Sequence, residues 1–140
     1  MKKITFFLCA LLISAMSFAE TATLSTISTK KVATQNGASV STTFGGVTCT
    51  VTKNSGNQPG FYTSSGIVRY YEKDVMTLSV ESGYAITRID FTMNSGSVGT
   101  ANPAGLVSNT WTGNAESVSF TGGGTVKINK IVVTYETYSA

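Results

Sequence analysis

The sequence from 47 to 52 reads Val47-Thr48-Cys49-Thr50-Val51-Thr52. Apolar side chains occupy the odd positions and threonine occupies the even ones. Successive side chains of a β-strand point to opposite faces, so this alternation predicts a strand with one face buried and one face in water. Threonine suits the wet face because its branched β-carbon favours extended backbone.

The same period of two recurs along the chain, in residues 75–80 and 117–121. No segment after residue 19 shows the sustained 3.6-residue apolar period of an amphipathic helix. Turn-forming residues separate the runs, among them Asn36-Gly37, Ser82-Gly83, Asn94-Ser95-Gly96 and Gly122-Gly123-Gly124. We therefore expect an all-β fold, an antiparallel β-sandwich of short strands.

Two long segments change the parity of their apolar positions. Ile86 and Ile89 are three residues apart, and so are Ile128 and Ile131. A strand that keeps one face buried cannot change parity unless it contains a bulge or crosses between sheets. Residues 84–93 and 125–135 are therefore expected to bulge or bend.

The first nineteen residues have the pattern of a secretory signal peptide. Met1-Lys2-Lys3 is basic, residues 4–18 are mostly apolar, and Ser17-Phe18-Ala19 ends with a small residue. We expect cleavage after Ala19 and a secreted or periplasmic location. Residues 20–140 then form a single domain. Residues 20–41 are its least defined part, with Leu24 and Ile27 in an opening edge strand and residues 30–39 as a polar loop.

Composition argues against several classes of function. The ten basic residues include Lys2 and Lys3, so eight basic and seven acidic residues remain after cleavage, a net charge of +1. So small a charge does not predict binding to nucleic acid or to an anionic membrane. The chain has no histidine, which removes the commonest general base and zinc ligand. Cys49 is the only cysteine after the signal, and it reads as an inert core thiol. We expect no enzyme activity, no metal and no cofactor.

A series of segments over roughly the last two thirds of the mature chain resembles a module of exported Bacteroidota proteins. They are Asn57-Gln58-Pro59-Gly60-Phe61-Tyr62, Val68-Arg69-Tyr70-Tyr71, residues 75–80, Ile86-Thr87-Arg88-Ile89-Asp90-Phe91, Trp111-Thr112-Gly113 and Ile131-Val132-Val133-Thr134-Tyr135. The resemblance implies a jelly-roll β-sandwich similar to carbohydrate-binding modules. It also implies an accessory role beside larger secreted proteins, including nucleases. The family carries no settled function, and this chain shows no catalytic domain beside the module.

Four residues are candidates for a binding site: Arg69, Tyr71, Trp111 and Tyr62. A guanidinium beside a phenol binds sugar hydroxyls or carboxylates well, and a Trp at the rim of a sandwich stacks on a sugar ring. Each has a structural alternative. Arg69 would bond backbone carbonyls or pair with Asp90 or Glu116, and Trp111 would close one end of the core.

The sequence leaves two hypotheses for function. In the first, the chain is a secreted non-enzymatic β-sandwich that binds a glycan or another extracellular ligand. In the second, it is a structural or assembly subunit that contacts a protein partner through a strand edge. The β-rich run Lys130 to Tyr135 is the edge that this second hypothesis invokes.

Overall fold

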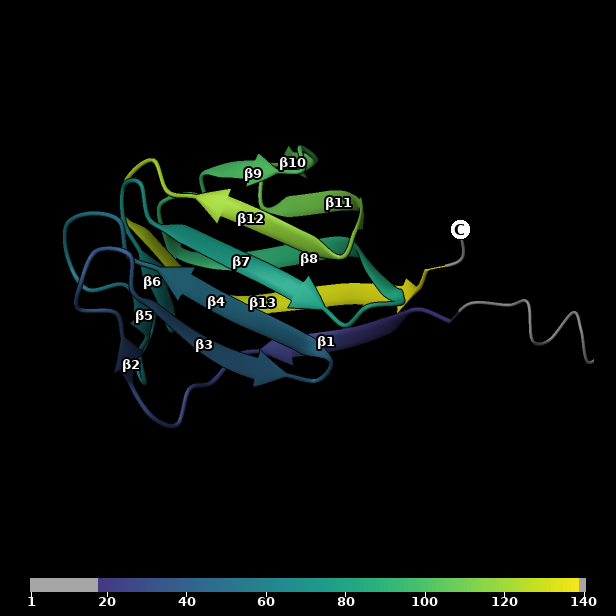
Figure 1. Ribbon diagram of the computed structural model, residues 1–140, viewed down its shortest axis with the longest axis horizontal. Helices are drawn as coiled ribbons and strands as arrows, with labels where there is room; N and C mark the ends of the chain where they lie inside the picture. Colours follow the sequence, from purple (N-terminus) through teal and green to yellow (C-terminus); the bar gives the residue numbers. More distant parts are fainter. Residues whose placement is uncertain (1–17, 139–140) are drawn as a thin grey trace, which may run out of the picture.

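Two antiparallel β-sheets pack face to face in the computed structural model, which describes residues 18–138 (Figure 1). Sheet A has eight strands: β1 (Glu20–Leu24), β2 (Lys31–Val32), β5 (Gly60–Phe61), β6 (Val68–Tyr70), β8 (Tyr84–Ser95), β10 (Leu106–Val107), β11 (Thr110–Ala115) and β13 (Val126–Thr137). Sheet B has five: β3 (Ser39–Phe44), β4 (Val47–Thr52), β7 (Val75–Val80), β9 (Thr100–Asn102) and β12 (Ser117–Thr121). The expected all-β antiparallel sandwich is confirmed; the jelly-roll connectivity stays a prediction.

The period-two pattern determines which side chains fill the space between the sheets. In β4 the residues Val47, Cys49 and Val51 are buried, while the intervening threonines are half-buried on the outer face. The order of strands is β3-β4-β7-β12-β9 in sheet B and β10-β11-β8-β13-β6-β5-β2 in sheet A, where β1 also pairs with β13. The buried apolar side chains of both sheets form one cluster. Burial of these side chains stabilises the fold at about 25 cal/mol per Å² of apolar surface.

The two parity changes are β-bulges, as the sequence predicts. In the pairing of β8 with β13, Arg88 is opposite Thr134 and Ile86 is opposite Tyr135, so Thr87 is an extra residue. In β13 the register steps from Ile128 to Lys130, so Asn129 is extra there. Each bulge returns the next apolar residue to the buried face without moving the strand into the other sheet.

Two segments have a different secondary structure or position in the sheet from the one that the sequence predicts. The predicted loop of residues 30–39 contains the short strand β2, and β3 begins at Ser39. The predicted edge at Lys130 to Tyr135 is wrong, because β13 lies inside sheet A. It pairs with β8 on one side and with β1 and β6 on the other. The opening strand β1 takes the place at the edge beside it.

The signal-peptide prediction falls almost wholly outside the described residues, since these begin at Phe18. It stays a prediction. Within residues 18–138, no helix is long and apolar enough to cross a membrane.

The turn that joins β6 to β7 is held by one buried carboxylate. Asp74 is fully buried, and its Oδ1 accepts hydrogen bonds from the backbone N–H groups of Asn54 at 2.6 Å and Ser55 at 3.1 Å. Its Oδ2 accepts a bond from the N–H of Tyr71 at 2.9 Å. Three backbone donors satisfy the carboxylate, which is the condition for burying a charge at tolerable cost. The turn therefore fixes the backbone of Tyr71 against the loop after β4.

Replacing Asp74 with asparagine should destabilise the protein by about 3 kcal/mol, because an amide nitrogen would then face a buried N–H group. Urea unfolding followed by fluorescence measures the loss. Glu72→Gln is the matched control, since Glu72 lies in the same turn with an exposed side chain. Equal midpoints for the two variants would contradict the role assigned to Asp74.

Candidate functional site

Arg69 lies in the middle of β6, and its side chain bends back over the loop that precedes the strand. Its Nε donates a hydrogen bond to the carbonyl of Gly66 at 2.8 Å, and its Nη2 donates one to the carbonyl of Ser65 at 3.0 Å. The guanidinium carbon lies 4.0 Å from the centre of the Tyr62 ring. Stacking on a ring while bonding carbonyls suits a planar guanidinium.

Tyr62 is at the centre of this cluster. Lys30 Nζ lies 5.1 Å from the ring centre, and the hydroxyl donates a hydrogen bond to the carbonyl of Gln58 at 2.6 Å. The phenol of Tyr71 lies close enough to influence the pKa of Tyr62. The pKa of Tyr62 is raised, chiefly because the phenol is partly removed from water; Tyr71 raises it further and the charge of Arg69 opposes both. We call Lys30, Tyr62, Arg69 and Tyr71 the Tyr62 cluster.

A tight turn places Arg69 and Tyr62 together. The N–H of Tyr62 donates to the carbonyl of Ile67 at 2.9 Å, which closes the loop of residues 62–67. Gly66 has φ of 73°, a left-handed conformation that glycine adopts without a steric cost. Its N–H donates to Oδ1 of Asn129, the bulge residue of β13, at 2.6 Å. The loop under the Tyr62 cluster is therefore tied directly to the centre of sheet A.

Residues of the same loop also line a cleft of about 330 Å³. Its lining is uncharged and consists mainly of hydroxyl and amide side chains: Ser25, Thr26, Thr63, Ser64, Ser65, Ile67 and Asn129. Ser65 supplies both a wall of the cleft and a carbonyl that holds Arg69. Groups of this kind donate and accept hydrogen bonds without requiring a charged ligand.

Trp111 does not join the cluster. Its side chain has no exposed surface, and its Nε1 donates a hydrogen bond to the carbonyl of Pro103 at 2.8 Å. Trp111 belongs to β11, where it lies opposite Ile89 of β8 on one side and opposite Leu106 of β10 on the other. Of the two roles that the sequence leaves open, the structure places Trp111 in the core, where burial of a large ring stabilises the sandwich. It is not available as a stacking platform.

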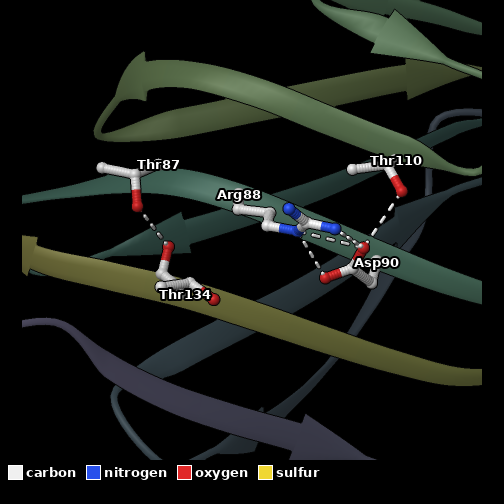
Figure 2. Close-up of polar contacts among 5 residues, drawn as sticks. All are labelled: Thr87, Arg88, Asp90, Thr110 and Thr134. Carbon is white, nitrogen blue, oxygen red and sulfur yellow. Dashed lines mark hydrogen bonds and ion pairs between the residues drawn. The ribbon is translucent and has the colours of Figure 1, made fainter.

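The alternative pairing of Arg69 with Asp90 is also excluded. Asp90 binds Arg88 instead, with 2.9 Å between Arg88 Nε and Asp90 Oδ2, and Thr110 donates to Asp90 Oδ1 at 3.0 Å (Figure 2). The hydrogen bonds from Arg88 lower the pKa of Asp90; partial burial opposes this, and the hydrogen bond from Thr110 lowers the pKa further. Arg88 and Asp90 are both exposed on β8, and the hydrogen bond from Thr110 connects this pair to β11. The carbonyl contacts expected for Arg69 are confirmed.

Sequence reasoning missed two residues of the site, Lys30 and Asn129. The sequence predicts that Lys30 lies in a polar loop, and no neighbouring residue indicates that this loop passes Tyr62. Asn129 lies at a parity change, which is the signal that marks it as a bulge residue. Its bond to Gly66 joins residues 63 positions apart, which a pattern of period two cannot reveal.

The described residues offer little for catalysis or metal binding. In residues 18–138, no group of three His, Cys, Asp or Glu side chains is placed to hold a metal ion. Cys49 is fully buried, and burial raises the pKa of its thiol to about 12. A thiol that stays protonated and enclosed is a poor nucleophile.

Comparisons of the chain with protein-family models, with curated proteins and with solved structures found no match. The resemblance to the exported Bacteroidota module therefore stays a prediction from the quoted segments. Function has to be argued from the fold and from the geometry of the Tyr62 cluster.

The buried position of Trp111 predicts how its fluorescence responds to a soluble quencher. Because no part of the side chain is exposed, acrylamide should quench the native protein several-fold less than the protein in 8 M urea. Stern–Volmer titration measures this, and free tryptophan provides the reference for full access. Native quenching close to that of the unfolded chain would mean that the ring is at the surface.

Proposed function

We propose that the chain is an exported, non-enzymatic β-sandwich that binds a glycan through the Tyr62 cluster. The observation that carries the proposal is the contact between Arg69 and Tyr62, 4.0 Å from guanidinium carbon to ring centre, beside an uncharged cleft rich in hydroxyl groups. Of the four residues expected from sequence, Arg69 and Tyr62 are in contact there, and Tyr71 lies close enough to influence the pKa of Tyr62.

The chemistry of the cluster suits a sugar. Pyranose rings have an apolar face that packs on an aromatic ring and a rim of hydroxyls that exchange hydrogen bonds. Arg69 has five N–H donors, and the loop carbonyls of Ser65 and Gly66 take bonds from its Nε and Nη2, which leaves Nη1 for a ligand. Tyr71 supplies a second half-exposed ring. A shallow site of this kind binds with modest affinity.

An assembly role is the second candidate. The segment from Lys130 to Tyr135 cannot serve as the contact edge, because β13 lies in the interior of sheet A. One observation still favours it: β3 ends the strand order of sheet B with a free edge of six residues. A strand edge of this length is a recognised surface for protein contact.

The proposal includes a location outside the cytoplasm, after removal of residues 1–19. The basic start and apolar run of the N-terminal segment support it. A mature net charge of +1 supports an uncharged ligand rather than nucleic acid or an anionic membrane.

Affinity electrophoresis in gels that contain different soluble polysaccharides tests the proposal. At least one polysaccharide should retard the protein, and Arg69→Gln should weaken that retardation about tenfold, since one orienting hydrogen-bond donor is lost. Arg88→Gln is the matched control, because Arg88 is an exposed arginine on β8 away from the cluster. The glycan proposal fails if no polysaccharide in a broad panel retards the protein. The site assignment fails if both variants bind alike.

A further inference from the structure

The free edge of β3 presents a row of unpaired backbone groups. β3 pairs with β4 from Ser39 opposite Thr52 to Phe44 opposite Val47, with no shift of register. Just before the strand, the N–H of Lys53 donates to the carbonyl of Ala38 at 2.9 Å, so the carbonyl of Ala38 points toward the side of β4. These directions alternate along an antiparallel strand. The N–H and C=O groups of Ser39, Ser41 and Thr43 therefore point to the open side.

Lys31 confirms this direction independently. Its Nζ donates a hydrogen bond to the carbonyl of Ser41 at 3.2 Å, which is possible only if that carbonyl points away from β4. A lysine beside an exposed strand edge commonly prevents unwanted pairing with the strands of other molecules. Because this bond is exposed, its net strength is small and a better partner can displace it.

A cleft of about 500 Å³ adjoins the end of this edge, between residues 42–44 of β3 and the segment that joins β1 to β2. Its lining is mainly polar, with hydroxyl groups from Thr26, Thr29 and Thr43. Ile27 adds apolar surface, whereas Leu24 and Phe44 are nearly buried. Lys31 is the only charged residue in its lining, so no carboxylate balances the ammonium group. The cleft combines backbone donors and acceptors, apolar contacts and one positive charge.

We propose that this cleft binds an extended peptide segment of a partner protein, which adds to sheet B as a strand beside β3 and places an acidic side chain near Lys31. Main-chain hydrogen bonds to Ser39, Ser41 and Thr43 provide affinity in this mode of recognition, and alternate side chains of the peptide enter the apolar part of the cleft. Strand addition displaces Lys31 from Ser41. A carboxylate on the peptide then compensates its charge.

The same features argue against other occupants. A glycan has no alternating N–H and C=O groups at the spacing of a strand, so it cannot continue the ladder. A second copy paired through its own β3 would bring an uncharged strand and a second Lys31, and like charges close together repel. The proposed peptide site is separate from the Tyr62 cluster and does not depend on the glycan proposal.

Synthetic peptides of defined sequence test the proposal with the full chain. The probe is a fluorescein-labelled seven-residue peptide of alternating Thr and Val with Glu at its centre. Two controls have Lys or Pro in place of the central Glu. Fluorescence anisotropy should show saturable binding of the Glu peptide, at least tenfold weaker binding of the Lys peptide, and no binding of the Pro peptide, because proline cannot donate to a ladder.

Two variants of the protein locate the site. Ser41→Pro removes one outward N–H and keeps the backbone bonds to β4, but it also loses the hydrogen bond between Ser41 Oγ and Thr50 Oγ1 at 2.9 Å. Because that side-chain bond is exposed, the variant should keep the native melting temperature within a few degrees and weaken peptide binding at least tenfold. Ser41→Ala loses the same hydroxyl but keeps that N–H, so it is the matched control and should bind the peptide like the native protein. Lys31→Glu should reverse the preference, so that the Lys peptide binds better than the Glu peptide. This second variant decides the question if Ser41→Pro does not fold.

Several results would overturn the proposal. They are absence of saturable binding by the Glu peptide, equal binding of the Glu and Lys peptides, and unchanged binding by Ser41→Pro. Competition by a soluble polysaccharide would instead assign the cleft to a glycan, and a dimer that Ser41→Pro dissociates would assign it to a second copy. Arg69→Gln should leave peptide binding intact, so failure of the Tyr62 cluster to bind glycans leaves this test unaffected.

Discussion

The pairing of β8 with β13 is the interaction on which the rest of the structure depends. Both strands run through twelve residues, and they pair over nearly their whole length. β11 adds to the far side of β8, and β1 and β6 add to the far side of β13. Ile89, Ile131 and Val133 of this pair are buried against the inner face of sheet B. Sheet A can therefore form only if these two strands are in register.

The bulges connect this register to the surface chemistry. Asn129 is the extra residue that restores Ile131 to the core, and its side chain accepts the N–H of Gly66. Gly66 in turn holds Arg69, which stacks on Tyr62. A chain of direct contacts thus joins the middle of the sheet to the candidate site. The position of the Tyr62 cluster is therefore tied to the register of β13.

The two-sheet architecture could be predicted from sequence, because the alternation of apolar and polar residues shows which face of each strand is buried. The alternation in residues 47–52 and the parity changes near Thr87 and Asn129 are local signals, and the structure confirms both. Which strands pair with one another depends on residues far apart in the sequence, so the pattern within a strand does not reveal its neighbours. The run Lys130 to Tyr135 therefore looked like an edge, although β1 and β8 flank it. For the same reason the sequence could not decide whether Trp111 was buried, and it did not place Lys30 beside Tyr62.

Native-state hydrogen exchange tests the central role of the β8–β13 pair most directly. The slowest amides of the protein should lie in the middle of these strands, at residues 89–91 and 131–133. Their exchange should require a free energy equal to that of global unfolding in urea, because sheet A cannot persist without them. Amides there that exchange at a clearly lower free energy than those of β4 and β7 would contradict the account.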